Sequence, residues 1–130
     1  MHTDMTRTFC LQPDKRQKQL HKIVLGAQRA AMARLRPGVK ASVVDKASRD
    51  YMKKFDHHDY FTHGLGHGVG MDIHEAPSLD PSSKDILKEN MIFTIEPGAY
   101  IPGYGGIRIE DMVLLTKKGK QVLTNFPRRL

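Results

Sequence analysis

Apolar residues recur every three or four positions over one long stretch in the first third of the chain. The repeating positions are Leu20, Ile23, Val24, Ala27, Ala31 and Leu35. This spacing predicts an α-helix with one apolar face. Gln12-Pro13-Asp14 is expected to begin the helix, and Arg36-Pro37-Gly38 is expected to end it. A second helix is expected to start at a capping box, Ser42-Val-Val-Asp45, and to run to about Phe55.

Four other stretches, rich in β-branched or alternating residues, favour β-strands. They are residues 3–11, 91–96, 107–115 and 120–124. The last two are expected to pair through a turn at Lys118-Gly119, and residues 56–60 are expected to form a polar loop with His57 and His58 in solvent. Two helices on one face of a curved antiparallel sheet make an α+β fold. The length of 130 residues suits one domain.

The net charge of +7 does not indicate a nucleic-acid partner. Its densest runs, at residues 15–18, 117–120 and 128–129, are scattered and lack interleaved aromatic residues. A solvated basic surface is therefore favoured, because electrostatics alone produces only non-specific affinity. No apolar run approaches the roughly 18 residues of a membrane span, and no secretory signal is evident. With Cys10 as the sole cysteine, a cytoplasmic protein without an internal disulfide is expected.

Residues 63–75 contain three of the seven histidines and four of the eleven glycines of the chain. Each interior glycine disfavours a helix by about 1 kcal/mol relative to alanine, and glycine offers a strand no side chain to pack. Glycine does allow backbone to approach a ligand closely. In extended chain His63 and His67 point to the same face. The alternative is a glycine-rich loop with incidental histidines.

Two carboxylates stand at the ends of apolar runs that resemble strands. Glu96 precedes a Pro-Gly pair, and Glu110 lies two residues after Arg108, on the same strand face. Buried charges need a partner or a metal ion. The alternatives are an Arg–Glu ion pair on a solvated strand and a carboxylate that introduces a turn. By itself, Asp4 suggests no more than an acid in an N-terminal loop.

Four motifs, taken in order, give the chain a resemblance to a known family. They are Asp4–Phe9, His63–Glu75, Thr94–Gly98 and Gly106–Asp111. Together they resemble the carboxyl-terminal part of the catalytic domain of Xaa-Pro aminopeptidases and prolidases. These enzymes share the pita-bread fold with creatinase and methionine aminopeptidase. The resemblance implies that residues 1–130 are a truncated metallopeptidase catalytic domain with a partial pita-bread fold, without its first strand.

The resemblance also implies the ligands of a metal centre. They are Asp4, His67, Glu96 and Glu110. In the family pattern Asp4 and Glu110 bridge two ions, whereas His67 and Glu96 belong to one ion only. The family's first metal aspartate, in an Asp-x-Gly-Ala segment, would precede Met1. One divalent ion rather than two is therefore expected, with Mn²⁺ first and Co²⁺ or Zn²⁺ as alternatives.

Further roles follow from the same resemblance. His63 and His74 would hold the substrate and move protons, and Tyr100 and Arg108 would brace the metal carboxylates. The catalytic residues implied are His63, His74, Glu96 and Arg108. His74 is seven residues from His67, so alternation would turn it to the opposite face. Its place in the site depends on the resemblance and on a turn at Gly70.

The implied reaction is hydrolysis of the bond between an N-terminal residue and proline, as in an Xaa-Pro aminopeptidase or dipeptidase. Substrates would be small peptides with proline second. The ion would lower the pKa of the attacking water, Glu96 or Glu110 would accept its proton, and His74 would stabilise the oxyanion or protonate the departing nitrogen.

The missing segment leaves this activity open. Weak activity is expected from the chain alone, with residues 3–11 as an unprotected edge open to a homodimer or other edge-strand association. The alternatives are an inactive pita-bread module that serves for binding, and a fragment that needs a partner chain. The four ligands are expected to converge on one cavity.

Overall fold

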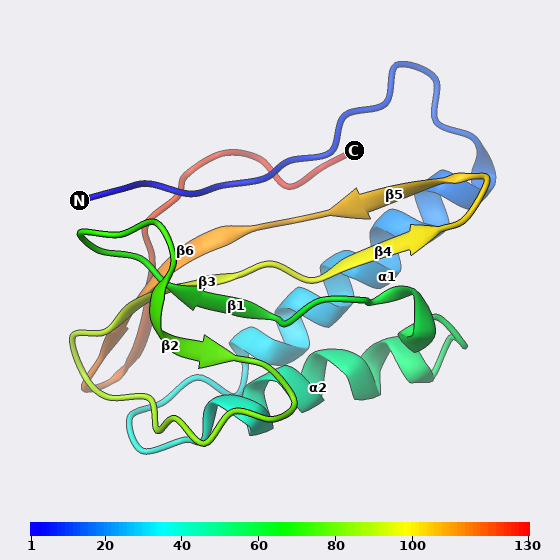
Figure 1. The fold of residues 1–130 in the computed structure, drawn as a ribbon. Coiled ribbons are helices and arrows are strands. Elements are labelled where there is room, and N and C mark those ends of the chain that lie inside the picture. Colours follow the sequence, from blue (N-terminus) through cyan, green and yellow to red (C-terminus); the bar gives the residue numbers. More distant parts are fainter.

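The computed structural model describes residues 1–130, which form two helices and two connected antiparallel sheets (Figure 1). The helices are α1 (Lys15–Met32) and α2 (Ala41–Lys53), followed by a short 3₁₀ helix at His58–Tyr60. The strands are β1 (Gly66–Gly68), β2 (Glu75–Leu79), β3 (Ile92–Ile95), β4 (Gly98–Ile101), β5 (Gly105–Arg108), β6 (Asp111–Thr116) and β7 (Gly119–Val122). This arrangement confirms the expected α+β class.

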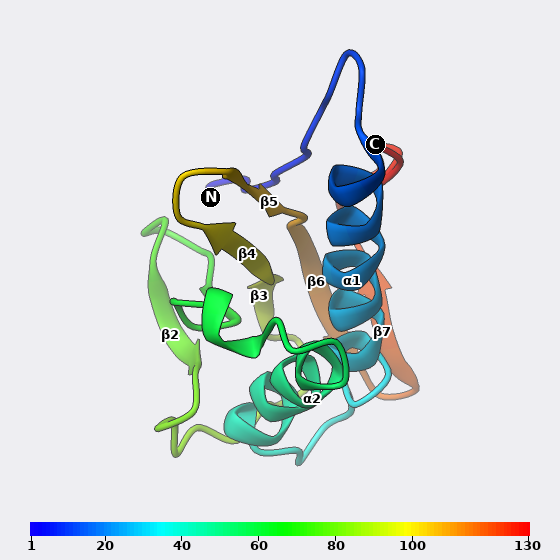
Figure 2. The same ribbon diagram turned by 90° about the vertical axis from the view of Figure 1, so that its right-hand side faces the viewer.

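The larger sheet has the strand order β2-β1-β3-β6-β7, and the smaller sheet pairs β4 with β5. The two sheets are continuous in the chain, since β3 leads into β4 and β5 leads into β6. The register passes from Ile95 opposite Asp111 in the large sheet to Gly98 opposite Arg108 in the small one. A two-stranded ribbon therefore runs through both sheets and is interrupted once, midway. Helix α1 packs on β3, β4 and β5 of this ribbon, and α2 packs on α1 and β2 (Figure 2).

Helix α1 begins where the sequence predicted it. The carboxylate of Asp14 accepts a hydrogen bond from the backbone N–H of Gln17 at 2.7 Å, and the Gln17 side chain accepts one from the Asp14 N–H at 2.9 Å. This is a complete capping box, and it satisfies two backbone donors that a helix start leaves free. The apolar face predicted from the three-and-four spacing is buried against α2 and the sheet.

The capping box predicted at the start of α2 is absent. No side chain caps this helix, whose cap residue is Lys40. Asp45, expected in a capping box, is fully buried one turn further on. Its carboxylate binds the Arg49 guanidinium at 2.7 Å and accepts from the backbone N–H of Leu65 at 3.1 Å. Packing of α2 against the chain around Leu65 therefore draws Asp45 inward.

The prediction of a strand over residues 3–11 is wrong. This segment is extended, but it makes only one isolated backbone bridge, between Thr6 and Glu110. It cannot pair further along β6, because β7 occupies the free edge of that strand. Beside β5 the hydroxyl of Thr8 replaces backbone pairing: it donates to the Arg108 carbonyl at 3.0 Å and accepts from the Arg108 N–H at 3.2 Å.

The strand predicted over residues 107–115 is two strands in the structure. β5 ends at Arg108, and β6 begins at Asp111. The predictions near 91–96 and 120–124 are confirmed by β3 and β7, and β6 and β7 are joined by the predicted turn. β1, β2 and β4 were not predicted, because their sequences are short and rich in glycine or proline. None of the helices combines the length and apolar character needed to cross a membrane.

Candidate metal centre

The interruption between the two sheets places two carboxylates side by side. Glu96 lies between β3 and β4, and Glu110 lies between β5 and β6. The backbone of Glu110 has left the β3–β6 ladder and instead exchanges two hydrogen bonds with Thr6, at 3.0 and 3.4 Å. The Thr6 hydroxyl also donates to the Glu110 carboxylate. The break in the ribbon therefore gives Glu110 a specific partner from the N-terminal segment.

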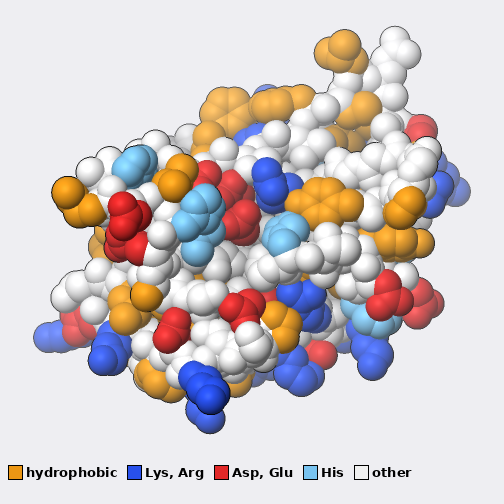
Figure 3. Space-filling view, viewed as in Figure 1, with side chains coloured by type: hydrophobic (Ala, Val, Ile, Leu, Met, Phe, Trp, Pro, Cys, Tyr) orange, Lys and Arg blue, Asp and Glu red, His pale blue; other side chains and the backbone are white.

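Asp4, two residues before Thr6, completes a cluster with His67. Ligand atoms of Asp4, His67 and Glu110 all lie within 4.8 Å of one another. Nε2 of His67 is 3.6 Å from Asp4 Oδ2 and 3.2 Å from Glu96 Oε1. The four residues expected to converge thus lie together, although four separate parts of the chain supply them. On the surface, histidine side chains lie on either side of a group of acidic side chains (Figure 3).

The glycines beside His67 allow its strand to approach the neighbouring backbone. A Cβ at Gly66 would lie 2.0 Å from the carbonyl oxygen of Thr94, and one at Gly68 would lie 2.1 Å from that of Ala76. Nδ1 of His67 lies 3.0 Å from the carbonyl oxygen of Gly68, which can only accept. Nδ1 therefore donates, and Nε2, which faces the carboxylates, is the ring nitrogen that would coordinate a metal ion.

Glu110 is 3% exposed. Burial raises the pKa of its carboxyl to about 7, a direction that the carboxylates of Glu96 and Asp4 reinforce and that the Thr6 hydrogen bond and the Arg108 guanidinium oppose. Arg108 forms no ion pair with either glutamate. Three carboxylates and one imidazole nitrogen are a donor set that fits a divalent metal ion.

His63 lies beside this cluster and is held by its neighbours. Its Nδ1 donates to the Gly64 carbonyl at 2.7 Å, so that Nε2 accepts from the Tyr100 hydroxyl, also at 2.7 Å. Burial raises the pKa of the Tyr100 hydroxyl, while the Arg108 guanidinium acts in the opposite direction. The backbone carbonyl of His63 accepts from Arg49 of α2 at 2.7 Å. Helix α2 therefore positions His63.

His74 reaches the site through a hairpin. β1 and β2 pair with a register shift between His67 and Gly68, and the chain turns back between them. The rings of His67 and His74 lie 4.2 Å apart, centroid to centroid. This return of the chain, rather than alternation along one strand, brings His74 to the cluster.

No hydrogen bond joins Tyr100 or Arg108 to the clustered carboxylates, which the family resemblance implied that they brace. The Tyr100 hydroxyl contacts His63 rather than a carboxylate. Arg108 is exposed and lines a cleft of about 430 Å³ next to His63, His67 and Glu96. His57 and His58, expected in solvent, contact Phe55 and Asp59 and take no part in the cleft.

The cleft has two lining residues that the sequence analysis missed, Ser78 and Asp80. Hydrogen bonds from the hydroxyls of Ser78 and Ser82 hold the pKa of the Asp80 carboxyl below its usual range. The distances are 2.6 Å from Ser78 and 2.7 Å from Ser82. No local pattern signalled these residues, because only the pairing of β2 with β1 brings them to the cleft.

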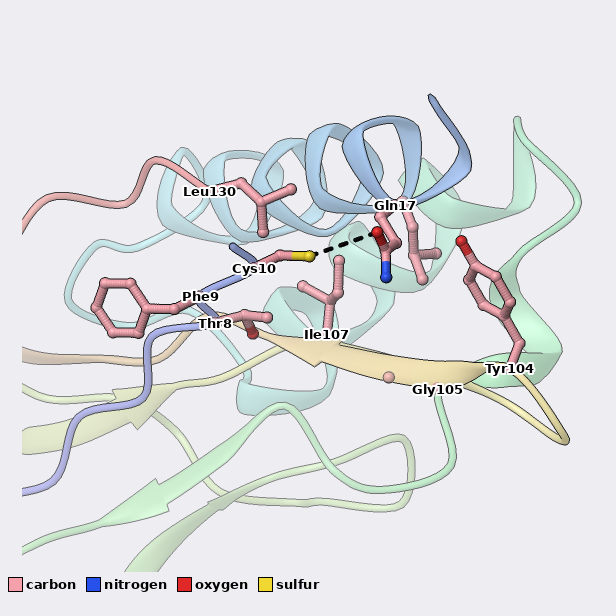
Figure 4. A pocket seen from close by; sticks show the side chains of 10 residues that line it. Thr8, Phe9, Cys10, Gln17, Tyr104, Gly105, Ile107 and Leu130 are labelled. Atoms are coloured by element: carbon pink, nitrogen blue, oxygen red, sulfur yellow. Dashed lines mark hydrogen bonds between the residues drawn. The ribbon is translucent and has the colours of Figure 1, made fainter. Parts of the chain in front are cut away.

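A second, smaller cavity of about 140 Å³ lies between the N-terminal segment, β5 and the first turn of α1 (Figure 4). Its walls are mostly apolar, and the Cys10 thiol donates there to Gln17 at 3.4 Å. It contains none of the clustered carboxylates or histidines. The cleft beside His67 is therefore the candidate site.

Residues 1–117 match the metallopeptidase family M24. The chain belongs to metallopeptidase family M24. This M24 chain is 45% identical over 130 residues to the Xaa-Pro dipeptidase of Pyrococcus furiosus, an alignment that covers 99% of the chain. The crystal structure of the prolidase from Pyrococcus horikoshii OT3 matches it with a TM-score of 0.95 at 43% identity over 98% of the chain. Membership of a metallopeptidase family implies a divalent metal ion.

The chain spans 37% of the length of each of these two relatives and is similar to their carboxyl-terminal part. The same fold occurs in the N-terminal domain of the FACT complex subunit SPT16 from chickpea, with a TM-score of 0.87 over 96% of the chain. At 23% identity, that likeness shows the fold alone. The partial pita-bread fold expected from the motifs is confirmed.

Proposed function

We propose that this M24 domain binds one divalent ion through Asp4, His67, Glu96 and Glu110. We further propose that it contributes to hydrolysis of the bond between an N-terminal residue and proline. The observation that carries the proposal is that ligand atoms of Asp4, His67 and Glu110 lie within 4.8 Å of one another, with Glu96 Oε1 3.2 Å from Nε2 of His67. The names of the similar dipeptidase and prolidase support the substrate class.

The donor set favours Mn²⁺ among the candidate ions. Three carboxylates and one imidazole are mainly hard oxygen donors, which suit Mn²⁺, whereas no thiolate is present to favour a softer ion. A bound ion would supply Lewis acidity, which lowers the pKa of the attacking water and polarises the peptide carbonyl. Co²⁺ and Zn²⁺ are the alternatives to test.

The chain's own side chains would orient the peptide and move the proton. Glu96 accepts a hydrogen bond from the Thr94 hydroxyl at 2.9 Å, which keeps one carboxylate oxygen oriented toward His67 while the group remains available to accept a proton. His63, held by Tyr100, would contact the peptide from the wall of the cleft. His74, exposed beside His67, would donate to the carbonyl oxygen or to the proline nitrogen.

Metal binding and hydrolysis, measured on one preparation, test the proposal. Calorimetric titration with Mn²⁺ should give one site per chain, and Xaa-Pro dipeptides should be hydrolysed in preference to matched Xaa-Ala dipeptides. His67→Ala should abolish Mn²⁺ binding, whereas His57→Ala, outside the cleft, should retain it. A His67→Ala chain that binds Mn²⁺ as tightly as the parent would refute this ligand set. Metal binding without turnover would favour a non-catalytic domain.

A further inference from the structure

Asp111, the residue after Glu110, has a fully buried carboxylate that contacts four side chains from other parts of the chain. Nη2 of Arg7 and Nε of Arg128 each donate to it at 2.6 Å. The Thr124 hydroxyl donates at 2.6 Å and the Gln28 amide at 2.8 Å. These donors hold the pKa of the Asp111 carboxyl below its usual range against the opposing effect of burial. One carboxylate thus joins β6, α1 and both terminal segments.

Arg7 makes more of these connections than any other member of the network. Its Nη1 donates to the carbonyl oxygens of Glu110 at 2.6 Å and Thr6 at 2.9 Å. Its Nη2 and Nε donate to the carbonyl of Phe126 at 2.9 and 3.2 Å. The Arg7 side chain is 4% exposed. Because the guanidinium is a rigid planar fork, these contacts fix its position relative to the backbone of Glu110.

The segment that carries Asp4 has few other attachments. It makes one backbone bridge, at Thr6, and no ladder. The remaining hydrogen bonds to the rest of the chain are those of His2 with Gly70, the Asp4 N–H with the Met112 sulfur, the Thr6 hydroxyl with the Glu110 carboxylate, the Thr8 hydroxyl with Arg108 and the Cys10 thiol with Gln17. A short extended segment without a ladder is free to fray unless side chains anchor it. Arg7, three residues from Asp4, is its buried anchor.

We propose that the Arg7–Asp111 pair is a positioning pair for the metal centre, which holds the Asp4 carboxylate at the distance that His67 and Glu110 require. Arg7 contacts the backbone of Glu110 but none of the side-chain ligand atoms of the cluster. Its effect passes through the backbone of Thr6 and Glu110, both of which Arg7 contacts. This inference rests on the proposed function in that it takes Asp4 to be a metal ligand.

Arg128 provides a matched control. It contacts the same carboxylate at the same 2.6 Å, but it lies on the C-terminal segment and contacts neither Thr6 nor Glu110. Arg7→Gln should raise the Kd for Mn²⁺ at least tenfold, whereas Arg128→Gln should change it less than threefold. Both variants should lose thermal stability. Equal losses of Mn²⁺ affinity in the two variants, or an unchanged Kd in Arg7→Gln, would overturn the proposal.

Amide hydrogen exchange without metal separates this proposal from the proposed function. In Arg7→Gln the N–H groups of Thr6 and Glu110 should exchange at least tenfold faster than in Arg128→Gln. If the parent chain binds no Mn²⁺, the metal-centre proposal fails, and exchange alone decides whether Arg7 orders the segment. Unchanged exchange at both amides would overturn the positioning role.

Should Arg7→Gln not fold, Arg7→Lys and Arg128→Lys repeat the comparison with the positive charge retained. The lysine ammonium cannot contact Asp111 and the carbonyls of Thr6 and Glu110 at once, as the planar guanidinium of Arg7 does. Compared with Arg128→Lys, Arg7→Lys should therefore still bind Mn²⁺ more weakly, and its Thr6 and Glu110 amide hydrogens should still exchange faster. Identical results for both lysine variants would again contradict the proposal.

Discussion

At the candidate centre, the histidine side chains of His67 and His63 have different partners and different expected roles. His67 faces the carboxylates through Nε2, whereas His63 is turned to Tyr100 by a hydrogen bond at each ring nitrogen. Two histidines four residues apart therefore have different partners, and we expect only one of them to affect metal affinity.

Tyr100→Phe tests this division. The variant loses the hydrogen bond to His63, which is worth about 1 kcal/mol, or about a fivefold change. We expect kcat/KM for an Xaa-Pro dipeptide to fall by about that factor, while the Kd for Mn²⁺ from calorimetry stays unchanged. A loss of Mn²⁺ affinity comparable to that of His67→Ala would instead mean that Tyr100 braces the metal carboxylates, as the family resemblance implied.

A second prediction at this level concerns His21, which is buried on α1, remote from the cleft. Burial lowers the pKa of its imidazole below 6.5, against the opposing effect of a hydrogen bond that the ring donates to the backbone of Arg128. The unfolded chain therefore binds more protons than the folded chain below that pH. The free energy of unfolding should be fully retained above pH 6.5 and should decline as the pH falls through the folded pKa.

Urea unfolding across this pH range, compared with His21→Gln, measures the effect. The stability difference between parent and variant should shrink as the pH falls below 6.5. His57→Gln is the control for the general effect of removing a histidine. If the difference between parent and His21→Gln is independent of pH, His21 does not carry the predicted contribution.

At the level of helices and strands, the glycine-rich motif is needed for packing, because its glycines let β1 lie close to the neighbouring backbone. β1 lies between β2 and β3, and Gly66 faces the Thr94 carbonyl at a distance that excludes a Cβ. Gly66→Ala should destabilise the fold by roughly 1–3 kcal/mol, the usual cost of overpacking, because backbone rather than a mobile side chain must move.

Gly64→Ala is the matched control, since a Cβ there would lie 3.1 Å from its nearest neighbours. We expect a clearly smaller change in the free energy of unfolding for Gly64→Ala, measured by urea titration. A Gly66→Ala chain as stable as Gly64→Ala would show that β1 can separate from β3 at little cost.

For the molecule as a whole, metal binding and folding should be linked. The cluster joins the N-terminal segment, β1 and the junctions between the sheets, so the complete ligand set exists only in the folded chain. Mn²⁺ at 100 times its Kd should stabilise the fold by about 2.7 kcal/mol, which raises Tm by several degrees. A chelator should reverse the shift.

His67→Ala is the control for this linkage, because it removes a ligand near the centre of the cluster. Its Tm should not respond to Mn²⁺ at the same concentration. An equal rise in Tm for parent and His67→Ala would place the binding elsewhere on the chain.

Much of the fold could be read from the amino-acid sequence because its signals are local. The spacing of Leu20 to Ala31 specifies α1, and the β-branched run that ends at Ile95 specifies β3. Asp4, His67, Glu96 and Glu110 were singled out by the resemblance of four ordered motifs to a known family.

Only the tertiary structure decided where these elements end and what their polar residues contact. The strand expected over residues 107–115 breaks at Glu110, because a partner 104 residues earlier, Thr6, takes its backbone groups. Asp45 does not cap α2, because its carboxylate binds Arg49 and the backbone of Leu65 instead. Residues 3–11 form no strand, because β7 occupies the edge of β6. Propensity and periodicity describe neighbours along the chain, whereas buried polar groups are satisfied by whichever partners folding brings near them.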